Sequence, residues 1–321
     1  MVLSDLAEKY VEYTILRPPS IRHYVWVMKT FTAVVGDIEI NDLTTEDIIK
    51  YRNIILARAK PITFNNYRQH IVVMINFAIA NEWIKVNPFS KIKPIRTPKK
   101  PKKTVEISLI EKVLILLEAA SGLSESSPHC QFQPQWFWRV VVLTFYSTGM
   151  RLRQLVELRW KDINHELGQI TLRVEGSKTS REWTIPMPIL IHDELLALRC
   201  KTMELSGNNI SDQQVFNLPL FSKFKKRFVK NEMREGNVQA FFKRASKVLG
   251  EPISSHRLRH TTATTLVKKH NDLKSIQILL GHASIRTTLE YVEEDIESMR
   301  NMVDGLTLAA RHPITAMKRG T

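Results

Sequence analysis

The feature that most constrains this 321-residue chain is a short basic segment at residues 91–104, KIKPIRTPKKPKKT. It holds seven Lys or Arg residues, no Asp or Glu, and three prolines, which disfavour a helix and favour an extended path. A chain of this length is expected to form two domains. The segment therefore predicts a linker between a domain at residues 1–90 and a second at 105–300, followed by a tail at 301–321.

The remaining composition excludes several classes of protein. The apolar and charged fractions, 43% and 25%, are those of a globular chain. Two cysteines, Cys130 and Cys200, form no CxxC pair, which argues against a zinc module or a disulfide scaffold and fits a reducing cytosol. The apolar runs are too short for a membrane span, and the first residues do not resemble a signal peptide. We expect a cytoplasmic protein with no membrane partner.

The basic charge favours a polyanionic partner. Nearly half of the net charge of +15 lies in residues 91–104, which suggests a strand that follows the phosphates of duplex DNA. A merely solvated linker or a nuclear address is the alternative. A second basic cluster at residues 223–230 is interleaved with phenylalanines. It fits a DNA contact and a solvated loop equally well. The linker side chains expected to contact DNA are Lys91, Lys93, Arg96, Lys99, Lys100, Lys102 and Lys103.

Residues 1–90 predict a bundle of four helices. The first is expected from Asp5 to Arg17, where Pro18 would stop it. The second would begin at a Ser20 cap and run to about Val35, and the third would begin at a Thr44 cap. The fourth would run from a Thr63 cap to about Trp83. The core face of the fourth helix is expected to hold Ile71, Met74, Ile75, Ala78 and Ile79. Candidate side chains for base recognition at its start are Thr63, Asn65, Asn66 and Arg68.

The second domain predicts a mainly helical fold with a small antiparallel β-sheet, an α+β class. Residues 121–135 indicate a polar loop, and residues 203–236 give no clear pattern. The strands are expected at Ile163, 170–174 and 183–186, with a turn at 176–180 between the last two. Helices are expected at 108–120, 136–147, 154–160, 238–249, 257–270 and 273–280, and from 285 onward.

Four separated motifs in this domain carry chemistry: TGMR at 148–151, GSKTS at 176–180, HRLRH at 256–260 and LGHASIRTTLEY at 280–291. Each alone is weak, because a turn lysine is usually solvated and a tyrosine on an amphipathic helix is usually packing. Together they supply cations, imidazoles and a phenol. The candidate catalytic residues are Arg151, Lys178, His256, Arg259, His282 and Tyr291.

These residue types suit the transfer of a phosphoryl ester. Two arginines can hold phosphate oxygens in a forked geometry, and His256 and Arg259 share a helix face. A tyrosine hydroxyl is a competent nucleophile when positive charge surrounds it, and a lysine can protonate a leaving alkoxide. The sequence contains no pattern typical of a carboxylate cage for Mg²⁺, so we expect no metal and no other cofactor.

The order and spacing of these motifs resemble the tyrosine recombinase (phage integrase) family. The family pattern is Arg in a TGLR-like segment, Lys in a β-hairpin, HxxR, and LGH with Tyr nine residues later. This chain matches it at each position from residue 105 to about 300, whereas residues 1–90 resemble the family's helical, SAM-like core-binding domain by pattern only. The resemblance implies two domains that close as a C-shaped clamp around double-stranded DNA.

The resemblance also implies a mechanism. Tyr291 would attack the scissile phosphate and form a 3′-phosphotyrosyl link, while Lys178 protonates the leaving 5′-oxygen and His256 assists proton transfer. Arg151, Arg259 and His282 would stabilise the transition state. A homotetramer on DNA would exchange strands through a Holliday junction without ATP. The implied role is integration or excision of a mobile element at specific crossover sites, in a bacterial, phage or element-encoded setting at the nucleoid, with accessory DNA-bending or directionality factors.

Two departures from the family pattern are visible. Gln154 stands three positions after Arg151, where members often have an acidic residue, so the local orientation of Arg151 is open. The first helix begins almost at the first residue, so we expect no additional arm-site-binding domain before the core-binding bundle.

The segment after the tyrosine, residues 292–304, carries five acidic residues and one arginine. We expect it to turn away from DNA, with residues 305–311 docking on a neighbouring protomer; a solvated, frayed end is the equal alternative. Two other functions stay open for the whole chain. One is a type IB topoisomerase that relaxes DNA, and the other is a non-catalytic DNA-binding regulator. The DNA site, and delivery of Tyr291 in cis or in trans, are not encoded in any readable pattern.

Overall fold

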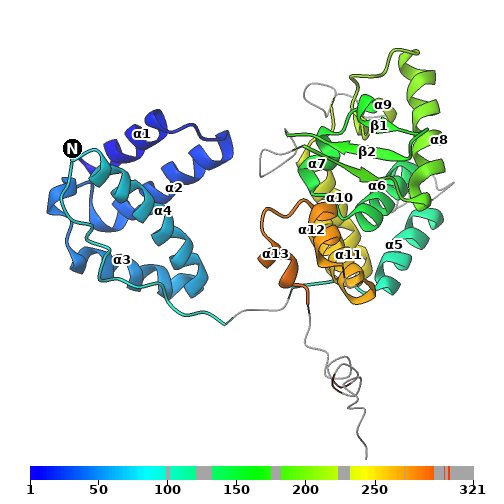
Figure 1. Cartoon of the computed structure of the whole chain (residues 1–321). Coiled ribbons are helices and arrows are strands. Elements are labelled where there is room, and N and C mark those ends of the chain that lie inside the picture. The colour runs from blue at the N-terminus through cyan, green and yellow to red at the C-terminus, as the bar shows by residue number, and fades with distance from the viewer. Residues whose placement is uncertain are drawn as a thin grey trace, which may run out of the picture. The chain divides into compact units, whose positions relative to one another are not determined.

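The protein forms two compact units, Met1–Lys100 and Pro101–Thr321, in the computed structural model (Figure 1). Each unit has its own hydrophobic core. Several segments lie outside the part of the chain that the structure describes, among them the predicted turn with Lys178, the second basic cluster, and Lys99 and Lys100. The described residues are 1–98, 102–120, 132–174, 182–222, 232–270 and 272–292, together with Arg300 and Val303.

The first unit contains the four predicted helices, but two of them begin differently. Helix α2 begins at Pro18 and α4 at Pro61, and neither has a side-chain cap, so the predicted caps at Ser20 and Thr63 are wrong. Proline is favoured in the first turn of a helix because its missing N–H is not needed there. The bounds are α1 Leu3–Tyr13, α2 Pro18–Val35, the 3₁₀ turn η1 Ile40–Asp42, α3 Thr45–Arg58 and α4 Pro61–Ala80.

The other predictions for this unit are mostly confirmed. Thr44 caps α3, and its side chain and that of Asp47 bind each other's backbone N–H groups. Four of the five predicted core residues of α4 are buried, whereas Ile79 is only partly buried. Helix α1 lies two to four residues earlier than predicted, and α4 ends before Trp83.

The first part of the basic segment packs on α4. Ile92 is buried in the core of the first unit. The Asn65 side chain donates to the Ile95 carbonyl oxygen at 2.8 Å and accepts from its N–H at 2.9 Å. Arg68 Nε donates to the Ile92 carbonyl oxygen at 2.6 Å. These side chains therefore hold the backbone of residues 92–95 against the helix.

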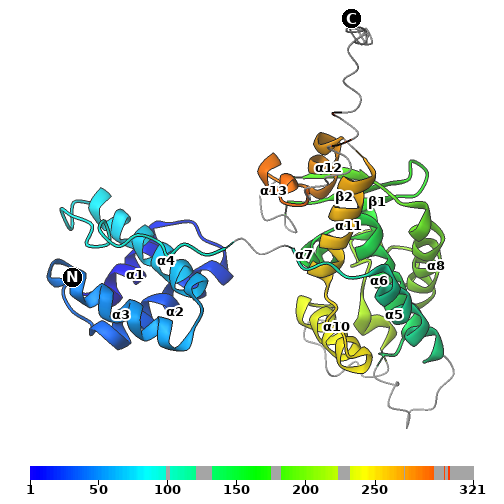
Figure 2. The ribbon, with the colours of Figure 1, turned by 90° about the horizontal axis from the view of Figure 1, so that it is seen from below.

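The second unit is mainly helical, and α6 and α11 lie side by side in its centre (Figures 1 and 2). The helices α5, α8 and α11 pack around α6. The helix bounds are α5 Ile107–Ala119, α6 Gln135–Thr148, α7 Leu152–Glu157, η3 Trp160–Asp162, α8 Ile189–Ser206, α9 Leu218–Phe221, α10 Glu235–Leu249, α11 Ser255–Lys269, α12 Leu273–Leu280 and α13 Ile285–Leu289.

The three described strands form the predicted antiparallel sheet in the order β1-β2-β3. They are β1 Ile163–Asn164, β2 Gln169–Leu172 and β3 Trp183–Pro186. Ile170 pairs with both Ile163 and Ile185, and these apolar side chains face the core. The strand at 170–174 is shorter than predicted, and the helix predicted at 154–160 is instead α7 followed by the turn η3.

Helix α8 is the longest described element that is not predicted from the sequence; the short helix α9 is another. Helix α8 follows Pro188 and ends at Gly207. Its buried residues, Ile191, Leu195, Leu198 and Thr202, recur every three or four positions, which is the helical pattern. Among the described residues, no helix combines the length and apolar composition needed to cross a bilayer.

Candidate active site

The site begins where α6 ends at Gly149. This glycine has a φ of +63°, and a Cβ there would lie 2.8 Å from Leu280 Cδ2. A glycine is therefore required both by the backbone and by the close approach of the end of α12. Arg151 follows two residues later and directly precedes α7.

Arg259 joins the two chain segments that meet here. Nη1 donates to the Gly149 carbonyl oxygen at 2.6 Å, and Nη2 donates to the Leu280 carbonyl oxygen at 2.8 Å. The residue is only 5% exposed. Burial, and then the charge of Arg151, lower the pKa of Arg259 to about 9. The guanidinium is therefore a buried cation at neutral pH.

Arg151 lies on the same segments and keeps a spare donor. Nη2 donates to the Gly281 carbonyl oxygen at 3.1 Å, while Nη1 is buried without a hydrogen-bond partner among the described residues. Burial lowers the pKa of Arg151. A buried charged N–H without a partner is costly, so it marks a place for an anionic ligand.

Gln154 explains how Arg151 is oriented without the acidic residue of the family pattern. Its Oε1 accepts a hydrogen bond from the backbone N–H of Arg151 at 2.7 Å, and its side chain is buried. The contact is with the backbone and not with the guanidinium. An amide performs this capping contact as a carboxylate would, but it adds no negative charge beside Arg151.

A tight contact supports the loop after α12. Gly281 has a φ of +60°, and a Cβ there would lie 2.1 Å from Trp183 Cζ2 on β3. The Trp183 indole N–H donates to the Leu279 carbonyl oxygen at 3.4 Å. The indole therefore fixes the loop whose carbonyl oxygens bind the two arginines.

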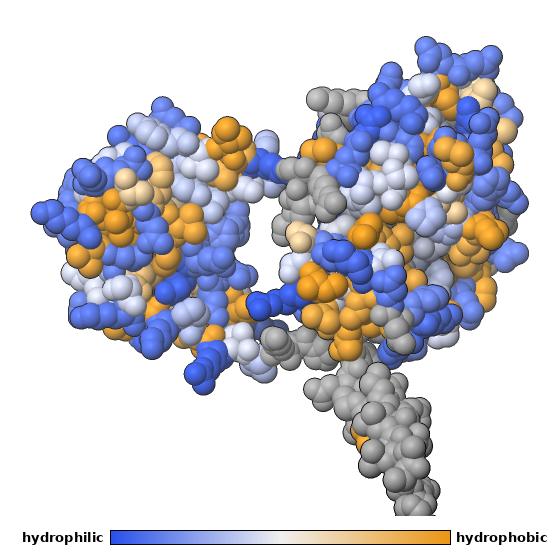
Figure 3. All heavy atoms as spheres, in the orientation of Figure 1, coloured by the Kyte–Doolittle hydropathy of each residue, from blue (hydrophilic) through white to orange (hydrophobic). Residues whose placement is uncertain are grey.

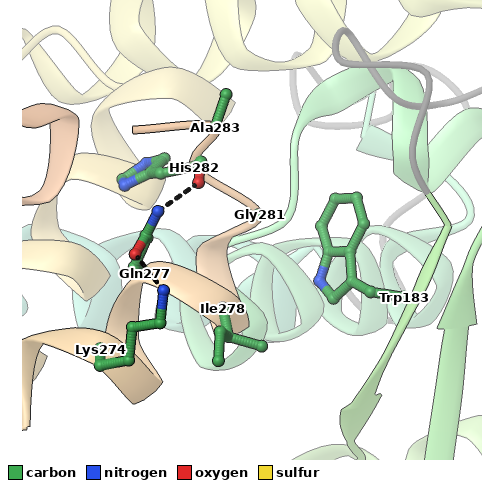
Figure 4. A pocket seen from close by; sticks show the side chains of 7 residues that line it. All are labelled: Trp183, Lys274, Gln277, Ile278, Gly281, His282 and Ala283. Atoms are coloured by element: carbon green, nitrogen blue, oxygen red, sulfur yellow. Dashed lines mark hydrogen bonds between the residues drawn. The ribbon is translucent and has the colours of Figure 1, made fainter. Parts of the chain in front are cut away.

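A small pocket lies next to this contact (Figure 4). Gln277 Nε2 donates to the His282 carbonyl oxygen at 3.0 Å, and Lys274 Nζ donates to Gln277 Oε1 at 3.2 Å. Figure 4 shows this chain of hydrogen bonds reaching from α12 to the backbone of His282, with Trp183 across the pocket. The backbone of His282 is thus held by the side chain of Gln277 on the preceding helix, α12.

The imidazole of His282 is buried beside Tyr291. Its Nδ1 lies 2.9 Å from the Thr288 hydroxyl, and its ring is stacked parallel to the Tyr291 ring at 6.0 Å between centroids. Burial, followed by the charges of Arg259 and Arg151, lowers the pKa of His282 to about 4. The ring is therefore neutral at neutral pH.

Tyr291 itself is 4% exposed. Its hydroxyl lies 2.7 Å from His260 Nδ1. Burial raises the pKa of the phenol, and the charges of Arg259 and Lys102 oppose this shift. Lys102 Nζ lies 5.9 Å from the Tyr291 ring centroid and pairs with Glu290 at 2.6 Å.

The residues after Lys102 are joined to α11. Val105 donates its N–H to the Thr261 hydroxyl at 2.8 Å, and that hydroxyl donates to the Val105 carbonyl oxygen at 2.9 Å. Thr261 directly follows His260 on the helix. The end of the basic segment is thus anchored at the site.

The structure brings five of the six predicted catalytic residues into one region, and the sixth, Lys178, lies outside the described residues. His256 is exposed at the start of α11, and its ring centroid lies 4.1 Å from that of His260. Burial, followed by the charges of Arg259 and Lys102, lowers its pKa. Sequence reasoning missed His260, although it lies four residues after His256 and therefore on the same helix face.

The predicted DNA contacts remain predictions. Asn66 is exposed and Thr63 is half-buried at the start of α4, whereas Asn65 and Arg68 bind the backbone of residues 92–95. Lys102 contacts Tyr291 and Glu290. The side chains of Lys91, Lys93, Arg96 and Lys103 are exposed.

The sequence matches the model of the phage integrase family over residues 129–297. A relative from Pseudomonas syringae that carries the name tyrosine recombinase XerC is 31% identical over 317 residues. The match covers 95% of this chain and 64% of the relative, so the chain spans less than two thirds of that relative's length.

Solved structures share the fold. A Tn1549 transposon integrase in complex with a circular intermediate DNA has a TM-score of 0.73 at 19% identity, over 95% of this chain and all of that one. A lambda integrase tetramer bound to a Holliday junction has a TM-score of 0.67 at 20% identity, over 91% and 78% of the two chains. With the family match over more than half of its length, the chain belongs to the phage integrase family of tyrosine recombinases.

Proposed function

We propose that this protein is a site-specific DNA recombinase that cuts and rejoins strands through a covalent link to Tyr291. The observation that carries the proposal is the buried Tyr291 hydroxyl in a site with the buried Arg259 and the half-buried Arg151, whose Nη1 is a buried donor without a partner among the described residues. A phosphodiester supplies the anion that such a site accommodates, and a phenol supplies the nucleophile.

In the proposed cleavage step, the proton of the Tyr291 hydroxyl passes to an imidazole of the HRLRH segment at 256–260. The Tyr291 oxygen forms a bond to the scissile phosphorus, and the bond from phosphorus to the 5′-oxygen breaks. Arg151 and Arg259 offset the charge of the pentacoordinate transition state, and neutral His282 adds a hydrogen bond. Lys178 gives a proton to the leaving 5′-oxygen, a role that the family pattern implies for this position. The 5′-hydroxyl of a partner strand then reverses the step, so no ATP is consumed.

The partner and the setting belong to the same proposal. The substrate is double-stranded DNA with specific crossover sites, and the role is integration or excision of a mobile element, with accessory DNA-bending or directionality factors. Residues 91–104 and the start of α4 are the proposed DNA contacts. The fold shared with the Tn1549 and lambda integrases, whose structures contain DNA, supports the proposal that DNA is the substrate.

We also propose a homotetramer on DNA that passes through a Holliday junction, with the tail at 301–321 docking on a neighbouring protomer. Exposed apolar side chains on α12 and α13, Ile278, Ile285 and Leu289, favour a protein contact there. Figure 3 shows apolar surface over these helices. Truncation after Asp304 should weaken tetramer assembly on DNA in cross-linking experiments; unchanged assembly and activity would reject the docking of the tail.

The central test is a suicide substrate, a duplex nicked beside the cleavage site and carrying the repeats that flank the gene. The wild type should form a covalent adduct that survives denaturation, and Tyr291→Phe should form none. No adduct on any flanking repeat would reject the enzyme and favour a DNA-binding regulator. Joining of strands from two different duplexes separates a recombinase from a topoisomerase that only relaxes DNA.

A further inference from the structure

We propose that His260 is a catalytic residue that accepts the hydroxyl proton of Tyr291 as the tyrosine attacks the phosphate. This role rests on the proposed cleavage reaction. His260 would take the proton of the nucleophile, whereas Lys178 would give a proton to the leaving 5′-oxygen.

The geometry supports a direct transfer. His260 Nδ1 lies 2.7 Å from the Tyr291 oxygen, which is a short hydrogen bond between two side chains that are 6% and 4% exposed. His260 is held on α11 directly after Arg259 and before Thr261, both of which have fixed partners. The acceptor therefore sits on a rigid element, with little water to compete for the proton.

The neighbouring groups are engaged elsewhere. His282 Nδ1 lies against the Thr288 hydroxyl. Glu290 pairs with Lys102. His256 is exposed and contacts the His260 ring. His260 is therefore the acceptor that the described residues offer to the phenol.

The protonation states fit the role of an acceptor. Burial, followed by the charge of neighbouring His256 and three cationic side chains, lowers the pKa of His260 to about 4. The imidazole is therefore neutral at neutral pH, and its Nδ1 can accept the tyrosine proton. Burial raises the pKa of Tyr291, so the proton stays on the phenol before DNA binds.

The proton moves because the acidity of the phenol oxygen changes during attack. As the bond from oxygen to phosphorus forms, that oxygen becomes far more acidic than an imidazolium, so transfer to a weak base becomes favourable. The charge of the bound phosphate also stabilises the imidazolium. In the rejoining step His260 returns the proton to the tyrosine oxygen as the phosphotyrosyl bond breaks.

Several charged or titratable groups surround His260 and Tyr291 and shape this pH dependence. Three of them, His256, Arg257 and Arg259, lie on α11. The others are Lys102 before α5, Arg151 before α7, and His282 and Glu290 beside Tyr291. Because most are cationic, protonation of His260 is suppressed until the phosphate enters.

The test measures single-turnover cleavage of the nicked duplex by the full chain. His260→Ala should lower the cleavage rate about 10²-fold, within the range typical of a general base, with DNA binding unchanged. His260→Asn keeps an acceptor atom near the position of Nδ1 but cannot take the proton, so its rate should stay well below wild type. His270→Asn, on an exposed histidine at the end of the same helix, is the matched control.

Two further measurements separate a catalytic role from a structural one. The wild-type rate should fall at acidic pH, where His260 is already protonated, and His260→Asn should lose that part of the acid limb. A substrate with sulfur at the bridging 5′-position has a better leaving group. It should rescue Lys178→Ala but not His260→Ala. Rescue of His260→Ala by the sulfur substrate would overturn the assignment.

The outcomes distinguish this role from the proposed function. If wild type forms the adduct, Tyr291→Phe does not, and both His260 variants cleave at the wild-type rate, the recombinase stands and His260 is not the acceptor. If wild type forms no adduct, both proposals fall. Thermal unfolding of each variant identifies a loss of fold, and His260→Asn carries the test where His260→Ala unfolds.

Discussion

Polar side chains bind backbone carbonyl oxygens in both units of this protein, but they do so in different environments. In the first unit Arg68 and Asn65 hold residues 92–95 at a partly exposed position. In the second unit Arg259 and Arg151 hold Gly149, Leu280 and Gly281, and Arg259 is almost fully buried. The same kind of contact is structural in one region and forms a cationic site in the other.

The two regions differ in whether their polar side chains keep unpaired hydrogen-bonding atoms after binding the backbone. Both polar groups of Asn65 are matched by the backbone of Ile95, whereas Arg151 keeps a buried donor without a partner. Placing the buried Arg259 beside the half-buried Arg151 costs free energy that backbone contacts alone do not offset. The second region therefore carries a cost that is relieved only when an anion binds.

The strongest test of this difference replaces Arg259 in the second unit and Arg68 in the first unit, one at a time. Arg259→Ala should lower single-turnover cleavage about 10³-fold, because it removes a transition-state cation and the bridge between two segments. Arg68→Gln, measured at saturating protein, should cleave within about twofold of wild type. Comparable losses in both variants would show that the two regions do not differ in role.

The next effect tests the support of the cationic loop. Gly281→Ala places a Cβ against the Trp183 ring, so the loop must move. Small displacements of catalytic groups can cost about 10²-fold in rate, and we expect a loss of that size in cleavage. Adding Trp183→Leu should restore part of the rate by making space. If Gly281→Ala alone cleaved at the wild-type rate, the Trp183 contact would not position the site.

A smaller effect is expected in the first unit. Asn65→Ala removes two hydrogen bonds to Ile95 and should lower the free energy of unfolding of that unit by about 1–2 kcal/mol. Urea unfolding of the full chain measures it, and the exposed Asn66→Ala is the control. Cleavage at saturating protein should be unchanged. A loss of cleavage without a loss of stability would give Asn65 a functional role.

The smallest effect concerns Gln154. Gln154→Glu keeps the acceptor for the Arg151 N–H and adds a negative charge, which should raise the pKa of Arg151. We expect cleavage to change by no more than about threefold, because the capping contact survives. Gln154→Leu removes the acceptor and should cost more, about tenfold. Equal cleavage rates for Gln154→Leu and Gln154→Glu would show that the capping contact does not orient Arg151.

The helices of this protein were largely predictable, and the errors have physical causes. From the sequence, Pro18 is interpreted only as the end of the first helix, but proline is also a good first residue of a helix, as Pro18 and Pro61 both are. Helix α8 has a helical pattern of buried residues, yet it follows β3 after two residues and lacks a polar cap. Such starts depend on tertiary packing and are hard to recognise locally.

The candidate catalytic residues could be singled out from the sequence because the order of the motifs is specific, although each residue alone is not. His260 was missed because the motif assigns roles to His256 and Arg259 only. Its contact with Tyr291 joins residues 31 positions apart, which no local pattern reveals. The unpartnered nitrogen of Arg151 and the contact of Trp183 with Gly281 are likewise products of packing.

The anchoring of Lys102 and Val105 has a consequence for engineering. Lys102 contacts the Tyr291 ring and pairs with Glu290, and Val105 is joined to Thr261, the residue after His260. A chimera that exchanges the N-terminal unit for a module of another protein should therefore be spliced upstream of Lys102. A junction placed at residue 105 would replace Lys102, a side chain of the candidate active site, along with that unit.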